Sequence, residues 1–302
     1  MPRIIQFLHP GLEPVPPSNS NIIPWNCTKA HKRKFLVSLG KYVSKGEEKE
    51  ACLTFWGEWE PQSCVERLPN LVGNFPKYLN RPFLDTNEKC CQNTDPNVFG
   101  EIFQYMVCGQ KMYLGLRNLE PNSLILFGSN KAGNFVLDTL FVVPENGTEY
   151  NRENIETLND EEKNAFYHAS IHPLICENSC VEINCDLIND CYRHYKGVSF
   201  LDKKSHHNIF SFVPALKFNN EKQKDSMFER PIIELPGIIS NGQRQGINGQ
   251  GGRNYTTVEI VDTWNKIVKQ VEDKGLLLAT QFTEPPMISK EEVINNCKKL
   301  NC

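Results

Sequence analysis

Two apolar runs separated by a short polar connector constrain the fold of this chain more than any other sequence feature. Residues 124–128 form the first run, 129–134 form a polar connector that contains a glycine, and 135–143 form a second run rich in Val, Leu, Phe and Thr. β-branched and aromatic residues are enriched in strands, and polar residues with glycine mark the turn between them. The pattern therefore predicts a β-hairpin.

Similar reasoning predicts further strands and a few helices around this hairpin. Apolar runs bounded by turn residues predict strands at 3–8, 35–43, 198–200, 209–213, 230–236 and 276–282. Thr256 and Glu259 have the spacing of a capping box, followed by apolar residues on one helical face. Capping patterns at Asn159 and Ser289 predict two other helices, the first ending near Ala169.

Strands are thus expected from one end of the chain to the other, without a linker or an internal repeat. We predict a single α+β domain over residues 1–302 with elaborations. Its core is expected to be a mixed, strand-rich curved sheet or a barrel, mainly within 35–143. The C-terminal part, 151–302, is expected to contain helices at the periphery.

Composition and charge place the chain among ordinary globular proteins. Of its 302 residues 39% are hydrophobic, and the net charge is −3, which gives no general attraction to nucleic acid. Neither a signal-peptide core nor an apolar run of membrane-spanning length is found, which predicts a cytoplasmic protein without membrane contact. Its 12 cysteines are then expected to be mainly buried thiols, metal ligands or catalysts. The histidines and cysteines around 176–191 lack zinc-knuckle spacing, which disfavours structural zinc.

The best candidate site is 55–61, where two tryptophans and two carboxylates occur within seven residues. In an extended strand, Trp56, Glu58 and Glu60 share one face, whereas Trp59 points to the other. An indole beside two acids could form the floor of a pocket for a flat, amine-bearing ligand. The alternative is a buried Trp59 that anchors the strand while the acids face water.

A basic segment precedes the first long predicted strand. It includes His31, Arg33 and Lys34, and an arginine there could hold a phosphate through two hydrogen bonds. The alternative is a solvated turn. We expect Glu58 and Glu60 to act only if this segment, or the turn at Asp95, folds over the Trp56 face.

Two further acids could join an enzyme site. Asp95 lies in the turn sequence 93–97, which can hold a carboxylate rigidly, and Asp138 is the one acid inside the second hairpin strand. If the chain is an enzyme, Glu58, Glu60, Asp95 and Asp138 are the candidates to converge as a general base or as ligands of a divalent metal. Each position also has a purely structural explanation.

The segment 119–129, Leu-Glu-Pro-Asn-Ser-Leu-Ile-Leu-Phe-Gly-Ser, resembles the turn and barrel strand of PUA-like folds, the group that includes the EVE, ASCH and YTH domains. That resemblance implies a small curved barrel with a pocket for RNA or a modified base. More loosely, the chain resembles uncharacterised bacterial and viral proteins grouped as nucleotide-modification-associated domains.

These observations lead to three functional hypotheses. The first is a protein that binds a nucleotide or a modified nucleic-acid base, stacked on Trp56 or Trp59 and recognised by a carboxylate, with His31, Arg33 and Lys34 at the phosphate. The second is a metal-assisted hydrolase or transferase that acts on the same ligands. The third is a protein-interaction domain without a small ligand. The sequence leaves the oligomeric state open.

Overall fold

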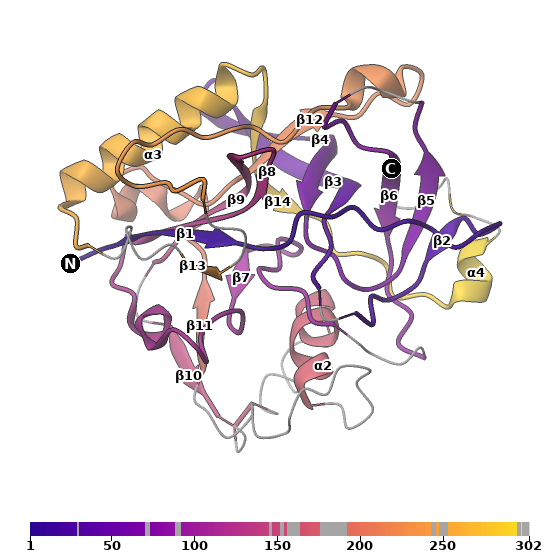
Figure 1. The fold of residues 1–302 in the computed structure, drawn as a ribbon, viewed down its shortest axis with the longest axis horizontal. Helices are drawn as coiled ribbons and strands as arrows, with labels where there is room; N and C mark the ends of the chain where they lie inside the picture. Colours follow the sequence, from indigo (N-terminus) through magenta and orange to yellow (C-terminus); the bar gives the residue numbers. More distant parts are fainter. Residues whose placement is uncertain are drawn as a thin grey trace.

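The computed structural model describes residues 1–28, 30–69, 73–87, 92–144, 147–151, 154–155, 164–175, 192–242, 246–247, 253–294, 297 and 302. The fold is α+β and rich in strands, with mixed sheets and few helices (Figure 1). The helices in the described part of the chain are too short or too polar to cross a lipid bilayer.

The largest sheet has seven strands and contains the strand that leads into the candidate site. Its order is β14 (Leu277–Phe282), β12 (Val213–Lys217), β4 (Glu47–Gly57), β3 (Lys34–Ser44), β6 (Tyr78–Pro82), β5 (Ser63–Arg67) and β2 (Ile22–Ile23). β3 and β4 form a long antiparallel hairpin, paired from Lys34 with Gly57 to Ser44 with Glu47. β14 pairs with β3 as well as β12, so β3, β4, β12 and β14 close into a ring.

A four-stranded sheet contains the hairpin predicted from the sequence. Its order is β13 (Gly246–Ile247), β1 (Ile4–Leu8), β8 (Leu124–Lys131) and β9 (Asn134–Val142). The antiparallel pairing of β8 with β9 confirms the hairpin, and β1 confirms the first predicted strand. β1 lies parallel to β8, which places the N-terminal segment beside the middle of the chain.

A three-stranded sheet and the helices complete the fold. The sheet has the order β10 (Thr148–Tyr150), β11 (Tyr192–Lys196) and β7 (Gln104–Tyr105). The helical segments are η1 (Leu114–Asn118), η2 (Tyr167–Ile171), α2 (His172–Ile175), η4 (Asp202–His206), η5 (Gln223–Ser226), α3 (Thr257–Glu272) and α4 (Lys290–Ile294). Figure 1 shows α3 and α4 on opposite sides of the molecule.

The longest helix, α3, forms where the sequence predicts it. The Thr256 side chain accepts from the Glu259 amide, and the Glu259 carboxylate accepts from the Thr256 amide, so the predicted capping box is present. Its apolar face, which includes Ile260, Trp264 and Ile267, is buried in a hydrophobic core. This burial explains why the helix is stable although its other face is polar.

Two hydrophobic cores lie on the two sides of the β3–β4 hairpin. Phe35 and Trp56 belong to the core that α3 covers, whereas Leu36 and Phe55 belong to the other core. Side chains alternate between the faces of a strand, so consecutive residues of β3 and β4 serve different cores. Both strands are therefore fixed from both sides, which gives the chain that follows β4 a rigid starting point.

Several predicted elements differ from the structure. Residues 198–200 form no strand, and the strand predicted at 209–213 begins at Val213 instead. Residues 230–236 are irregular apart from a single bridge between Ile232 and Val136, because Pro231 and Pro236 have no amide to donate. Much of the helix predicted from Asn159 lies outside the described residues, and 165–175 are helical.

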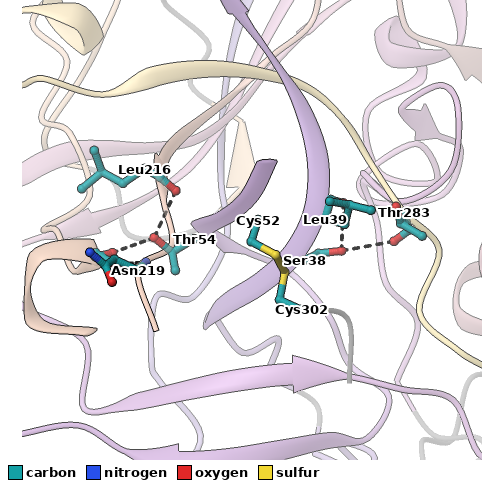
Figure 2. The surroundings of a disulfide bond; sticks show 9 residues. Ser38, Leu39, Cys52, Thr54, Leu216, Asn219, Thr283 and Cys302 are labelled. Carbon is teal, nitrogen blue, oxygen red and sulfur yellow. Dashed lines mark hydrogen bonds between the residues drawn. A yellow bond between two sulfur atoms is a disulfide. The ribbon is translucent and has the colours of Figure 1, made fainter. Parts of the chain in front are cut away.

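Disulfides connect the C-terminal end of the chain to the seven-stranded sheet. Cys302 is bonded to Cys52 on β4, as Figure 2 shows, and Cys297 is bonded to Cys64 on β5. Cys27 is also disulfide-bonded, so Cys108 is the one free thiol among the described cysteines. The expectation that the cysteines are mainly reduced thiols is therefore wrong for this part of the chain, because the fold brings distant cysteines within bonding distance.

Candidate active site

A buried carboxylate, Glu58, is the centre of a charged cluster just after the end of β4. Its Oε2 atom lies 2.5 Å from Arg33 Nη1 and 3.1 Å from His9 Nδ1. Its Oε1 atom lies 2.8 Å from His31 Nδ1 and accepts a 3.0 Å hydrogen bond from the Asp95 amide. Three cationic or potentially cationic groups thus surround one carboxylate, and only 4% of the Glu58 surface is exposed.

His31 connects this carboxylate to a thiol. Its Nε2 atom lies 3.8 Å from the Sγ atom of Cys108, while its Nδ1 atom faces Glu58. Glu60 Oε1 lies 3.2 Å from the same Nδ1 atom. The order thiol, imidazole and carboxylate, with Nε2 toward the nucleophile and Nδ1 toward the acid, is the arrangement of catalytic triads.

Cys108 belongs to a tight loop that Asp95 holds in place. The Asp95 carboxylate accepts hydrogen bonds from the backbone amides of Met106, Val107 and Cys108, at 3.2, 2.7 and 2.5 Å. Gly109 follows with a φ of 74°, and a Cβ atom there would come within 2.8 Å of the Phe7 ring. The loop therefore requires glycine next to the thiol, and it packs directly against β1.

The electrostatic surroundings favour a thiolate on Cys108. Burial by itself would raise the thiol pKa, but the neighbouring His9 and His31 outweigh it and lower the pKa of Cys108 to about 6. Burial would lower the pKa of His31, yet Glu58 and Cys108 raise it well above its ordinary value of 6.5. Near neutral pH the pair is therefore a thiolate and an imidazolium, on a cysteine that is partly exposed as a residue.

His9 supports the same charge distribution from β1. Its ring stacks on that of His31, with centroids 5.2 Å apart and planes at 13°. Burial acts to lower its pKa, but Cys108 and Glu58 raise it above 6.5. Two imidazoles in contact can both be charged here because an anionic sulfur and an anionic carboxylate lie beside them.

A second carboxylate, Asp138, extends the cluster inward along β9. Arg33 Nε donates to Asp138 Oδ2 at 2.8 Å, and Arg230 Nη1 lies 3.7 Å from Asp138 Oδ1. Arg33 thus bridges Glu58 and Asp138, and both acids are paired, as the cost of burying a lone charge requires. This inner part of the cluster is closed to solvent, since Arg33 is 1% exposed.

The tryptophans predicted to stack on a base are core residues. The Arg230 guanidinium lies over the Trp56 ring, with its Cζ atom 4.6 Å from the ring centroid. The Trp56 indole donates to Phe228 O. Trp59 is fully buried, packs edge-on against Phe99 and donates to Gln62 O. Stacking of a base on either indole stays a prediction, and it would require these packed neighbours to move.

The basic residues predicted at a phosphate point inward as well. Arg33 is paired with the acids described above, and Lys34 Nζ donates to Pro61 O at 2.6 Å. Burial lowers the pKa of Lys34 to about 7, against a smaller opposite effect of Glu60. His31 is the most accessible of the three predicted residues, with 13% of its side chain exposed. A phosphate role of this segment stays a prediction.

The structure brings the four predicted acids into one connected region. Glu58 and Glu60 contact His31, and Asp95 is bonded to Glu58 through its backbone amide. Asp138 is connected to Glu58 through Arg33. His31, Glu58 and Glu60 offer ligand atoms within 4.8 Å of one another, close enough for a metal ion. Their oxygens already have partners, however: Glu60 accepts from the Lys32 amide and from the Asn26 side chain. A metal role stays a prediction.

Sequence reasoning missed the two residues that change the chemistry of the cluster, Cys108 and His9. Neither belongs to a recognisable motif: Cys108 stands in Met-Val-Cys-Gly, and His9 follows a strand as part of His-Pro. The glycine after Cys108 is the one local signal, because nucleophiles often lie on turns with unusual backbone angles. The candidate zinc region 176–191 lies outside the described residues.

Comparisons with known proteins supply no further constraint. No protein-family model, curated protein or solved structure matches the chain. The side chains of the cluster and their geometry are therefore what bears on the function.

Proposed function

We propose that the chain is a cysteine-dependent enzyme that transfers or hydrolyses acyl groups. The observation that carries this proposal is the line of three groups from Cys108 Sγ through His31 to Glu58, with separations of 3.8 and 2.8 Å. The thiolate is the reactive form of cysteine, and an adjacent imidazole is the usual means of forming it. Cys108 is partly exposed as a residue, and the proposed attack requires a substrate to reach its sulfur from that side.

Each residue then has a defined task. Cys108 Sγ attacks the carbonyl carbon of an ester or amide, and its lone pair forms the new carbon–sulfur bond. His31 Nε2 gives its proton to the leaving group as the tetrahedral intermediate collapses to a thioester. A water or a second substrate then attacks the thioester carbonyl, with neutral His31 taking up its proton, and the carbon–sulfur bond breaks to release the acyl product and restore the Cys108 thiolate. Glu58 is a positioning residue, since its contact with Nδ1 turns Nε2 toward the sulfur.

Of the functions predicted from the sequence, only the broad enzyme class agrees with this proposal. An enzyme of the hydrolase or transferase class was one of the expectations from the sequence, there with a metal instead of a thiol. A nucleotide or a modified base as the substrate, the PUA-like resemblance and a cytoplasmic location stay predictions. The disulfides weigh against the cytoplasmic location, because such bonds are typical of oxidising compartments.

Trapping the acyl-enzyme tests the proposal. The protein is mixed with p-nitrophenyl acetate at pH 7, quenched in acid and digested, and the Cys108 peptide is examined by mass spectrometry. We expect an added acetyl group on Cys108 and a burst of p-nitrophenol that corresponds to one equivalent of enzyme.

Two variants serve as controls. Cys108→Ser replaces the thiol by a weaker nucleophile and should abolish the burst, while His31→Gln should lower its rate by about 10²- to 10⁴-fold. A burst that persists in Cys108→Ser, or acetylation that leaves Cys108 unmodified in the native protein, would overturn the proposal.

A further inference from the structure

A buried glutamine lies beside the thiol and the imidazole and has no role in the mechanism given so far. The Nε2 atom of Gln92 is 3.0 Å from His31 Nε2, the ring nitrogen that also faces Cys108 Sγ. The Gln92 amide and the Cys108 sulfur thus meet at the same atom. The two groups contact this one ring nitrogen at 3.0 and 3.8 Å.

The backbone of Gln92 is held rigidly enough for its side chain to be preorganised. The Trp25 indole donates to the backbone carbonyl of Gln92 at 2.8 Å, and the backbone amide of Gln92 donates to Asn26 O at 2.9 Å. Asn26 is in turn bonded to Glu60 through both its backbone and its side chain. Gln92 is therefore fixed to the same acidic segment that positions His31, and it is 6% exposed.

The donor most often used in such sites is engaged elsewhere. In acyl-transfer enzymes the backbone amide of the nucleophile commonly stabilises the negative oxygen of the tetrahedral intermediate. Here the Cys108 amide donates to Asp95 Oδ2. A side-chain donor near the sulfur would then have to supply this hydrogen bond. Beside a protonated His31 Nε2 the Gln92 side-chain amide has to turn its carbonyl oxygen to the ring, a flip that exchanges its O and N atoms, and its two N–H groups then remain to donate to a substrate oxygen.

We propose that Gln92 donates a hydrogen bond to the oxyanion that forms when Cys108 attacks an acyl carbonyl. The sulfur lone pair forms the carbon–sulfur bond, and the carbonyl π electrons move to the oxygen, which the Gln92 N–H group stabilises. When the carbonyl forms again, the carbon–oxygen bond to the leaving group breaks, and that group takes the proton of His31. This assignment rests on the proposed acyl-transfer function.

Two reactions of the same thiol test the proposal. Acylation by p-nitrophenyl acetate passes through an oxyanion, whereas alkylation by iodoacetamide is a direct displacement at carbon that forms none. We expect Gln92→Leu to slow acylation of Cys108 by about 10²- to 10³-fold, the usual cost of losing one such donor. Alkylation of Cys108 should keep its rate within about twofold and its dependence on pH, because no oxyanion is involved.

The outcomes separate the two proposals. If the native Cys108 reacts with neither reagent, the acyl-transfer function is wrong and the role of Gln92 falls with it. If native Cys108 is acylated and Gln92→Leu is acylated equally fast, or loses both reactions to the same degree, only the oxyanion role is overturned. If Gln92→Leu does not fold, the same two rates are measured for Gln92→Asn, whose shorter side chain keeps an amide but holds it farther from His31 and Cys108.

Discussion

Cysteine has two different fates in two regions of this molecule. At the C-terminal end, Cys297 and Cys302 are joined covalently to β5 and β4. Beside β1, Cys108 is a partly exposed residue with a free thiol, whose neighbours are two histidines and a chain of acids. The residue type is the same, so the difference comes from the surroundings.

The comparison separates two ways of holding a fold together. The disulfides restrict the unfolded chain by closing very long loops, with sequence separations of 250 and 233 residues. The cluster around Glu58 instead depends on charges that have to be matched in the folded state, and their balance sets the chemistry of Cys108. Mutations in the two regions should therefore differ in whether they change the thiol.

The largest effect is expected from the centre of the charged cluster. Glu58→Gln would leave Arg33, His9 and His31 without their shared partner, and removing one partner of a buried charge pair costs about 3–5 kcal/mol. The free energy of unfolding in urea should fall by this amount. Glu50→Gln, on the exposed part of β4, is the matched control and should change it by less than about 0.5 kcal/mol. Similar losses in both variants would contradict the role given to Glu58.

The same substitution should alter the acid side of the stability profile. Burial would raise the pKa of Glu58, but His31, Arg33 and His9 lower it well below its ordinary value of 4.5. A carboxylate of this kind stabilises the folded state fully above its unfolded pKa, and the contribution is lost as the pH falls through the lowered folded pKa. Urea unfolding of Glu58→Gln should therefore depend less on pH below 4.5 than that of the native protein.

Removing one disulfide should destabilise the protein without changing the thiol. The double variant Cys64→Ala, Cys297→Ala should lose about 2–4 kcal/mol of unfolding free energy, because the unfolded chain regains its freedom. The pH dependence of Cys108 alkylation should stay the same, since neither residue belongs to the cluster. A shift in that pH dependence would show that the disulfide and the cluster are coupled, and would contradict their independence.

A smaller effect is expected from the residue that holds the Cys108 loop. Asp95→Asn replaces one acceptor oxygen by an NH₂ group that faces backbone amides, and an unsatisfied buried group costs about 1–3 kcal/mol. Hydrogen exchange at the amides of Met106, Val107 and Cys108 should become faster. Asp225→Asn, at an exposed position, is the control. Unchanged protection of the three amides would contradict the role of Asp95.

The sequence predicted the framework of the site better than its chemistry. Periodicity and capping located the hairpin of β8 and β9 and the helix α3, because these signals are local. The sequence singled out Glu58 and Glu60 for their place among two tryptophans, Asp95 for its turn, and Asp138 as the one acid inside a predicted strand. Their partners could not be derived, since Arg33, just before β3, meets Asp138 on β9 only through the tertiary fold.

The surroundings of Cys108 show why the sequence could not predict the reactive thiol. Its reactivity depends on His9 at one end of β1, on His31 before β3 and on Asp95 in a separate turn. No spacing rule connects these positions. The cysteines also could not be divided into free and bonded ones, because the pairs Cys52–Cys302 and Cys64–Cys297 depend on where the end of the chain lies.

The rate of Cys108 alkylation by iodoacetamide as a function of pH tests the central claim most directly. Peptide mapping by mass spectrometry distinguishes Cys108 from the other cysteines. We expect the rate to rise with a midpoint near the lowered pKa of Cys108, about 6. In His31→Gln the midpoint should move upward, since an ordinary thiol has a pKa of about 8.5. A native midpoint near that ordinary value, unchanged in His31→Gln, would contradict the thiolate–imidazolium pair.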